Sequence, residues 1–463
     1  MEKNDRIVAL ARRIVDAKYE NLTPEEIKGA KYGIMDGIGV TLAGSTLSNK
    51  GHILVELALE YGGKEESTVL GYGGKLPAPW AAYANGAMVH CLDYDDYYSR
   101  AGVHPSHACL AAALAVAEMR GDVSGKEFIT AFAAASDLLI RVGLVGSPEG
   151  QKDNGVFNAY ATSYFGAAAV AGKLLNLNED QMVSCLGIAF SQLSSSMQIL
   201  NESDSNMREI FPALSGKTGV LAAILAQKGV QGVKDILDGK AGYLNIELRG
   251  IYHPEWIEVK PEDRNMVADI CIKPTPACGQ TLIFIDLAND MVKEHNIKPE
   301  QVKKITLKVG KFGYVLCIPE EKKKRPPLPM DAKSSIPYCV AYCVAYGKRP
   351  GLSAFMPETL KDENILAISE KVEIDYDVDY GTTVLVEPGT VTIELNDGTV
   401  YTAEGSYQYG CTENPIREED LVEKFRECAS YSRKPIADMD KLVDTLKNLE
   451  KVENFGEVIS MVG

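Results

Sequence analysis

Three of the six histidines in this 463-residue chain fall in one stretch, residues 84–118, together with several aspartates. The acid–base residues of this stretch are His90, Asp93, Asp95, Asp96, His104 and His107. An imidazole titrates near neutral pH, and a neighbouring carboxylate can fix its tautomer, so these residue types suit proton-transfer chemistry. The alternative interpretation is that these groups only satisfy one another at a helix junction.

Two helices are expected to hold this stretch in place. Small residues before His90 suit a tightly packed helix, whereas the acidic and aromatic residues after it lack a helical period. Pro105 disfavours helical backbone at His104. Ser106 is then expected to cap a helix rich in Ala and Leu. We therefore predict two buried helices that clamp a polar loop.

Aspartate and histidine are also ligands for zinc, iron or manganese. However, the sequence contains no HExxH, HxH or CxxC spacing that would support a metal site. The alternating Asp-Tyr-Asp-Asp order of residues 93–96 would also not place ligands on one side of a loop. The sequence therefore predicts no metal.

The overall composition limits the partners and the location of the chain. A net charge of −16 and a pI near 5.0 argue against a nucleic-acid partner, which needs a basic surface. A membrane span is not expected, because no apolar run reaches about 18 residues. The charged, amphipathic N-terminus does not match a secretion signal. Ten scattered cysteines fit reduced thiols, so a cytoplasmic location is expected.

Helical periodicity dominates residues 1–266. Four glycines within residues 32–45 (Gly33, Gly37, Gly39 and Gly44) permit close helix approach and predict a crossing of packed helices. They do not match a dinucleotide-binding fingerprint, because no strand precedes them. Ala, Gly and Ser recur in the other helical segments, which implies short distances between helices. We predict a helical bundle.

The pattern changes after residue 266. Strand-like alternation occurs in residues 302–309, 371–380 and 390–404, and Asn396-Asp397-Gly398 in the last is a hairpin signal. The charged, proline-containing run 320–330 predicts a loop, and residues 332–348 predict a helix. The predicted fold is mostly α: a helical domain of residues 1–266, an α+β domain of residues 267–405, and a C-terminal segment of residues 406–463 that returns to the helical domain.

Seven segments, in this order along the chain, resemble the MmgE/PrpD family. They are DGIGVTLAG, NGAMVHCLDYDD with HPS, GAAAVAGKLLNL, SSSMQ, SGKTGVLAAILAQKGVQG, KPTPACGQT and AKSSIPY. The family includes 2-methylcitrate dehydratase, cis-aconitate decarboxylase and iminodisuccinate epimerase. The resemblance implies a homodimer whose subunits pair a helical domain, closed by the C-terminal segment, with a smaller α+β lid. It also implies an active site between the domains that needs no metal or organic cofactor.

The motifs carry four catalytic residues over to this chain. Asp93 in LDYDD and His104 in HPS match the acid–base residues of the family, and Lys273 in KPTP and Tyr338 in SSIPY match its lysine and tyrosine. In this interpretation His104 is the base or acid and is oriented by Asp93. Lys273 holds a substrate carboxylate, and Tyr338 donates a proton. Read singly, Lys273 could instead be a rim residue and Tyr338 a packed aromatic.

The chain also departs from the family pattern. Phe157 stands where relatives carry histidine, Arg208 where they carry lysine, and Tyr97 where they carry threonine. Arginine keeps the charge and adds a bidentate fork for a carboxylate, but it does not readily lend a proton. Relatives often end the KPTP-like segment with Thr-His, whereas this chain has Leu282. The predicted substrate-binding residues are Arg208, Tyr97, Phe157 and Gln198, in a bulkier pocket with fewer proton carriers.

Three functions are therefore expected from the sequence. The first is a cofactor-independent lyase, of the dehydratase type, that removes a proton next to a carboxylate of a small di- or tricarboxylate. The second is an epimerase or isomerase of a small dicarboxylate, which returns the proton without elimination. The third is a binding protein that has lost catalysis, because Phe157 and Leu282 replace histidines.

Overall fold

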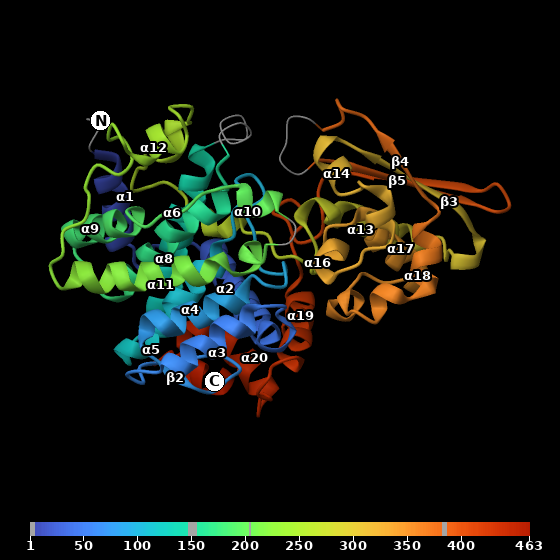
Figure 1. The fold of residues 1–463 in the computed structure, drawn as a ribbon. Coiled ribbons are helices and arrows are strands. Elements are labelled where there is room, and N and C mark those ends of the chain that lie inside the picture. Colours follow the sequence, from blue (N-terminus) through green and yellow to red (C-terminus); the bar gives the residue numbers. More distant parts are fainter. Residues whose placement is uncertain (1–4, 147–154, 203–204, 382–386) are drawn as a thin grey trace. The chain divides into compact units, whose positions relative to one another are not determined.

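The computed structural model describes residues 5–146, 155–202, 205–381 and 387–463. The chain divides into two compact units (Figure 1): unit 1 contains Met1–Ile272 and Glu418–Gly463, and unit 2 contains Lys273–Arg417. The sequence analysis drew these boundaries after residues 266 and 405. The first segment of unit 1 ends at Ile272 instead of residue 266, because the backbones of Cys271 and Tyr97 exchange two hydrogen bonds, with N···O distances of 2.7 and 2.9 Å.

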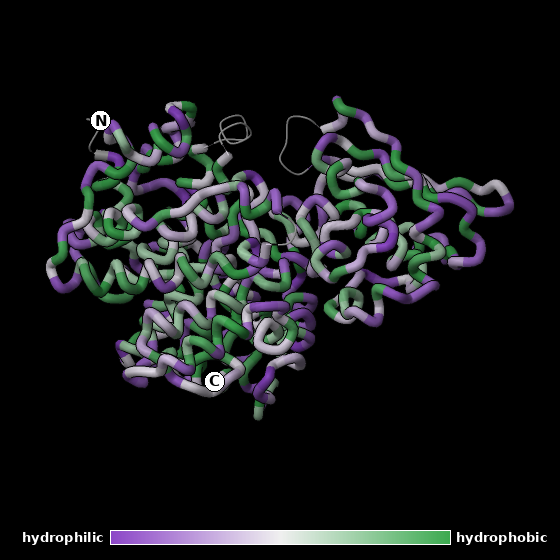
Figure 2. Tube along the Cα trace, in the orientation of Figure 1, coloured by the Kyte–Doolittle hydropathy of each residue, from purple (hydrophilic) through white to green (hydrophobic). Residues whose placement is uncertain are grey.

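Unit 1 is built almost entirely from helices, and hydrophobic residues recur along most of them (Figure 2). Its helices are α1 (Asp5–Val15), α2 (Pro24–Leu47), α3 (Gly51–Tyr61), α4 (Ala78–Val89), α5 (Pro105–Arg120), α6 (Gly125–Val145), α8 (Asn158–Leu174), α9 (Glu179–Phe190), α10 (Gln198–Asn201), α11 (Met207–Gln227), α12 (Tyr243–Ile246), α19 (Glu418–Ser430), α20 (Met439–Lys447) and α21 (Gly456–Val462). Two short strands, β1 (Ser67–Thr68) and β2 (Lys75–Leu76), pair antiparallel. The mostly-α prediction is confirmed.

The expectation of nearly continuous helix fails for residues 228–271. Apart from α12 and short 3₁₀ turns, this stretch has an irregular backbone. Glycine and proline recur in it, and both residues interrupt helices.

The glycine-rich part of α2 is a crossing of packed helices, as predicted. A Cβ atom at Gly37 would lie 2.5 Å from the Leu110 side chain of α5, and one at Gly44 would lie 2.2 Å from the Met88 carbonyl oxygen of α4. A larger residue at either position would force the helices apart. The glycines therefore set how closely α2 approaches the two helices that border the acid–base stretch.

Two helices of unit 1, α6 and α11, are long and apolar enough to cross a membrane by length and composition. The apolar window is 100% buried within the structure for α6 and 67% buried for α11. In unit 1, α6 packs against α8, and α11 packs against α4 and α8. Their hydrophobicity is that of helices in a bundle core.

Unit 2 combines a four-stranded sheet with helices. Its elements are α13 (Gly279–Glu294), β3 (Val302–Val309), α14 (Lys311–Val315), α15 (Glu320–Lys324), α16 (Pro329–Lys333), α17 (Ile336–Tyr346), α18 (Glu363–Ser369), β4 (Val372–Tyr376), β5 (Gly389–Leu395) and β6 (Val400–Gly405). The strand order is β4-β3-β5-β6, with β3 and β4 parallel and the other pairs antiparallel. The predicted strands are confirmed. So is the hairpin, whose Gly398 has a φ of 88°.

The predicted loop at residues 320–330 is wrong in part, because α15 and the start of α16 lie within it. In α15 the acidic residues stand in the first turn and the lysines in the last, which favours a helix through its dipole. Lys324 also pairs with Glu320 one turn earlier, at 2.9 Å.

The C-terminal segment returns to unit 1, where α19 packs against α2. The ammonium group of Lys424 on α19 forms an ion pair with Asp36 of α2 and donates to the Tyr94 carbonyl oxygen at 2.7 Å. Both charged side chains are almost completely buried, at 4% and 0% exposure. This contact ties the C-terminal segment to the loop between α4 and α5 (residues 90–104), which we call the acid–base loop.

We expect Lys424→Met to lower the free energy of unfolding by about 3–5 kcal/mol, because it leaves the Asp36 charge buried without its partner. The measurement is urea unfolding followed by circular dichroism. Arg426→Met is the matched control, because Arg426 lies on the same helix and pairs with Asp440 at the surface. The control should change stability by less than about 1 kcal/mol. Equal effects of the two variants would contradict the role given to Lys424.

Candidate active site

The acid–base loop lies between α4 and α5, as predicted. His90 follows the last residue of α4, and His104 precedes Pro105, the first residue of α5. The prediction that Ser106 caps α5 is wrong, because Ser106 lies inside the helix. Its N–H and hydroxyl donate to the carboxylate of Asp96 at 2.9 and 2.8 Å. Asp96 thus satisfies an N–H group of the first turn, which fixes the loop to the start of α5.

Asp95 lies at the centre of three histidines. Its carboxylate oxygens are 2.9 Å from Nδ1 of His90, 3.2 Å from Nδ1 of His104 and 3.9 Å from Nδ1 of His107. Asp95 itself is fully buried. Burial alone would raise the pKa of this carboxyl group, but the neighbouring His90 and His104 outweigh burial and hold the pKa well below its usual range. Asp95 is therefore an ionised carboxylate in contact with imidazoles.

His104 has a defined tautomer in this arrangement. Its Nδ1 lies 2.7 Å from the backbone carbonyl oxygen of Asp96, which can only accept a hydrogen bond. The proton therefore belongs on Nδ1, and Nε2 keeps the lone pair that a general base needs. Backbone and carboxylate together orient the ring.

The carboxylate that contacts Nδ1 of His104 is that of Asp95, and this corrects the prediction that Asp93 orients the ring. Asp93 adopts a φ of 53°, which is uncommon for a residue other than glycine. Its carboxylate is buried and lies 3.6 Å from the guanidinium of Arg208. The structure therefore places Asp93 beside the cation that was predicted to bind substrate.

His107 is the most deeply enclosed of the three imidazoles. Burial, followed by the neighbouring His90 and His104, lowers its pKa well below the usual value. Within the described part of the chain, neither ring nitrogen has a hydrogen-bond partner. His107 is therefore a neutral imidazole in the fold.

His90, Asp95 and His107 were present in the stretch that the sequence analysis selected, but no role was assigned to them. The available signal was that His104, the N-cap residue of α5, and His107, in its first turn, stand three residues apart at the start of one helix. His90 and Asp95 join them only through the path of the loop. The donor atoms of the four residues lie within 4.8 Å of one another, so the group could also hold a metal ion.

An aromatic wall borders the imidazoles. Phe211 of α11 packs against His90 and His107, with ring centroids 5.2 and 5.1 Å apart. Phe157, a predicted substrate-binding residue, packs edge-on against Phe211 at 5.5 Å. This approach of α11 depends on Gly86 of α4, where a Cβ atom would lie 2.6 Å from the Pro212 carbonyl oxygen.

The other predicted residues of unit 1 differ in their surroundings. Tyr97 is buried, and its ring centroid lies 6.5 Å from that of His104. Arg208 lies in the first turn of α11, and 36% of its side chain is exposed. Gln198 is exposed and donates to the carboxylate of Glu202 at 2.7 Å. Tyr97, Phe157 and Arg208 thus lie in or beside the group around Asp95, whereas Gln198 contacts Glu202 at the end of its own short helix.

Lys273 and Tyr338 belong to unit 2. Lys273 is buried, with 2% exposure. Tyr338 is fully buried in α17, and its hydroxyl donates to the carbonyl oxygen of Ala354 at 2.8 Å. Burial raises the pKa of Tyr338 well above its ordinary value. Their catalytic roles stay predictions from sequence.

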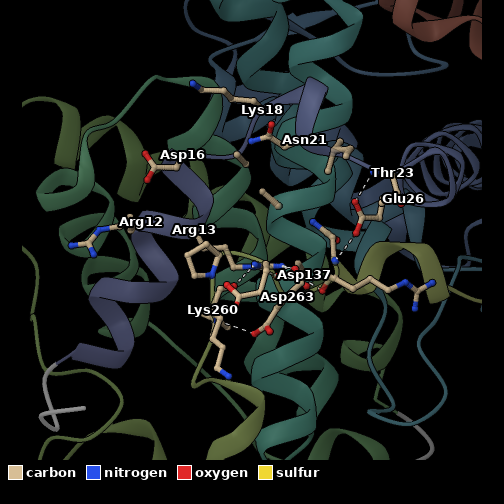
Figure 3. A pocket seen from close by; sticks show the side chains of 18 of the residues that line it. Arg12, Arg13, Asp16, Lys18, Asn21, Thr23, Glu26, Asp137, Lys260 and Asp263 are labelled. Carbon is tan, nitrogen blue, oxygen red and sulfur yellow. Dashed lines mark hydrogen bonds and ion pairs between the residues drawn. The ribbon is translucent and has the colours of Figure 1, made fainter.

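Unit 1 also contains a cavity of about 650 Å³ next to α1, the start of α2, α6 and residues 259–265 (Figure 3). None of the predicted site residues lines it. Polar side chains of the lining are bound within the protein: Arg13 donates to Asp137 at 2.7 Å (Figure 3). Glu26 accepts from the backbone N–H groups of Thr23 and Asn265. These contacts assign the lining a structural role.

Comparison with known families identifies the fold to which this site belongs. The model of the MmgE/PrpD N-terminal domain matches residues 8–251, and that of the MmgE/PrpD C-terminal domain matches residues 275–448. The chain belongs to the MmgE/PrpD family. Within this MmgE/PrpD chain, Asp93, His104 and Arg208 fall in the N-terminal match and Tyr338 in the C-terminal one, whereas Lys273 lies between the two.

Curated relatives of this MmgE/PrpD chain are similar over nearly its full length. The cis-aconitate decarboxylase of Homo sapiens is 27% identical and covers 98% of this chain and 94% of its own length. The cis-aconitate decarboxylase-like protein of Aspergillus oryzae is 23% identical, with 98% and 96% covered. The cis-aconitate decarboxylase of Aspergillus terreus is 24% identical, with 95% and 93% covered.

Proposed function

We propose that this chain is a cofactor-independent lyase that acts on a small di- or tricarboxylate by proton transfer at the carbon next to a carboxylate. The observation that carries the proposal is the arrangement of His104, whose Nδ1 is held by the Asp96 carbonyl oxygen and the Asp95 carboxylate. Arg208 supplies a cation that is partly exposed and suits a substrate carboxylate. The full-length similarity to cis-aconitate decarboxylases supports an activity on carboxylic acids.

In a dehydration, Nε2 of His104 takes the proton from the carbon next to the carboxylate. The electron pair of the broken C–H bond passes through an enediolate-like state and forms the C=C bond. The C–O bond to the neighbouring hydroxyl breaks, and the leaving hydroxide takes the proton back from His104 to become water, which regenerates the base. Fixed cations or hydrogen-bond donors must offset the negative charge of this state.

Decarboxylation is the second candidate, and the names of the relatives favour it. Here the C–C bond to a carboxylate breaks, carbon dioxide leaves, and the electron pair stays on carbon as an enediolate-like carbanion. The protonated His104 then donates a proton to that carbon. The same residue serves both reactions, as a base in one and as an acid in the other.

The experiment that tests the proposal is incubation of the purified chain with cis-aconitate and a panel of hydroxy- and amino-polycarboxylates. Products are followed by proton NMR, so that alkene formation and loss of carbon dioxide are both seen. Turnover of one or more acids is expected. If no acid of the panel changes, the lyase proposal fails, and the binding homologue becomes the better explanation.

An epimerase would behave differently when the same incubation is carried out in D₂O. It removes and returns the proton, so solvent deuterium enters the substrate without an alkene or carbon dioxide being formed. That outcome would replace the lyase by the isomerase named in the sequence analysis.

Arg208 is expected to contribute mainly to substrate binding. We predict that Arg208→Ala raises KM by about 10- to 100-fold with a smaller change in kcat, because the guanidinium holds a carboxylate in the ground state and in the transition state alike. The KM of Arg208→Lys should lie between those of the wild-type chain and Arg208→Ala, because lysine keeps the charge and loses the bidentate geometry of the guanidinium. Lys217→Ala on the same helix is the matched control. An unchanged KM together with lower stability would show that Arg208 only pairs with Asp93.

The family resemblance also supports a homodimer with a small carboxylate as its ligand. Static light scattering of the purified chain tests the dimer, and a mass equal to one chain would refute it. Neither nucleic acid nor a membrane is proposed as a partner.

A further inference from the structure

His107 is a buried polar group to which the proposed reaction gives no role. Both of its nitrogens lack a hydrogen-bond partner in the described residues, and the side chain is 0% exposed. A buried polar atom without a hydrogen-bond partner destabilises the fold, and such an atom in a native protein calls for a bound water or ion as its explanation. The Nδ1 atom lies 3.9 Å from a carboxylate oxygen of Asp95, too far for a hydrogen bond.

We infer that His90, Asp95, His104 and His107 form a binding site for a divalent first-row transition-metal ion such as Zn²⁺. Their donor atoms lie within 4.8 Å of one another. Zinc holds imidazole nitrogens and carboxylate oxygens at about 2.0–2.2 Å, so two tetrahedral ligands stand about 3.4 Å apart. The distances from a carboxylate oxygen of Asp95 to Nδ1 of His90 and to Nδ1 of His107, 2.9 and 3.9 Å, bracket that value.

The ligand set selects the class of metal. Three imidazoles and one carboxylate suit zinc, cobalt, nickel, copper or iron, whereas magnesium and calcium prefer sites made of oxygen. The Asp95 carboxylate supplies negative charge, and the imidazoles of the three histidines supply nitrogen ligands. The hydrogen bond from Nδ1 of His104 to the Asp96 carbonyl oxygen is the kind that orients a metal-binding histidine and leaves Nε2 for the metal.

The sequence analysis rejected a metal because no short motif was present. The four residues instead come from the residue after α4, the loop and the first turn of α5, so no short motif with a fixed spacing identifies them in the sequence. The inference goes beyond the proposed function, in which no metal takes part. Because His104 would serve as ligand and as base, a bound ion would prevent it from taking a proton.

The test uses the full-length chain after treatment with a chelator. It is dialysed against buffered Zn²⁺, and bound zinc is measured by mass spectrometry without any substrate present. We expect one zinc per chain. The same stoichiometry is expected for a variant that carries His52→Ala, His253→Ala and His295→Ala, because these are the three histidines outside the cluster. Co²⁺ should give the visible absorption of a four-coordinate nitrogen–oxygen site in both proteins.

His107→Ala and Asp95→Asn should each weaken zinc binding by about 10- to 100-fold or more. Thermal unfolding without metal shows whether these variants fold. Should either fail to fold, the wild-type chain and the triple variant decide, because that comparison leaves the cluster intact. Absence of stoichiometric zinc from the wild-type chain, or its loss from the triple variant, overturns the inference.

Failure of this inference and failure of the proposed function are distinguishable. Zinc binding by the chain, together with no turnover of any acid by the chelator-treated, metal-free chain, would remove only the lyase proposal. Turnover without zinc binding would remove only the metal site.

Discussion

His104→Gln is expected to lower kcat/KM by about 10²–10⁴-fold for whichever carboxylic acid the wild-type chain converts. The imidazole is the proposed group that moves the proton, and its Nδ1 is already engaged by the Asp96 carbonyl oxygen and by Asp95. Glutamine approximates the shape of the ring and can keep one hydrogen bond, but it cannot exchange a proton near neutral pH. Catalysis should therefore be lost while the variant stays folded.

Initial rates over a range of substrate concentrations measure this loss. His253→Gln is the matched control, because His253 is exposed and lies outside the cluster. It should keep the wild-type rate. Retention of more than half of the activity by His104→Gln would assign the proton transfer to another residue.

Asp95→Asn should give the second large effect, a fall in kcat of about 10²–10⁴-fold with KM nearly unchanged. A carboxylate that fixes the tautomer of a catalytic histidine contributes in this range, although it touches no substrate. Asp95 is 0% exposed, so we expect it to act through His104 as a positioning residue. An amide in its place can donate a hydrogen bond to an imidazole, which favours the wrong tautomer.

Nitrogen-15 NMR of the imidazoles separates this role from a merely structural one. In the wild-type chain His104 should carry its proton on Nδ1, and in Asp95→Asn a second tautomer should appear. Asp122→Asn, a surface change, is the control and should leave both kcat and the spectrum unaltered. A variant with the wild-type tautomer and a low kcat would contradict the positioning role.

The parts of the fold that depend on neighbouring residues could be predicted from the sequence. The α2–α4 and α2–α5 crossings followed from glycines, and the β5–β6 hairpin followed from Asn396-Asp397-Gly398, because these residue types act locally. The helical content of unit 1 followed in the same way. The irregular stretch 228–271 was missed although its glycines and prolines are local signals against a helix, and α15 was missed because its charged residues stand next to prolines.

The candidate site could be predicted only in part. The sequence analysis selected residues 84–118 and His104. It named Asp93 as the carboxylate beside the His104 ring, a position that Asp95 occupies in the structure. Which carboxylate faces the ring depends on the backbone conformation of the loop. The positive φ of Asp93 cannot be predicted from the presence of an aspartate in the sequence. The buried pair of Lys424 and Asp36 could not be predicted either, because it joins residues far apart in the chain.

Exchange with solvent deuterium tests the central claim, proton transfer by His104 next to a carboxylate, most directly. The wild-type chain and His104→Gln are incubated with the substrate panel in D₂O, and proton NMR follows the hydrogen on the carbon beside the carboxylate. The account predicts that the wild-type chain places deuterium at that carbon of the substrate or product and that His104→Gln does so at least about 100-fold more slowly. Equal incorporation by the two proteins, or none by the wild-type chain on any acid, would contradict it.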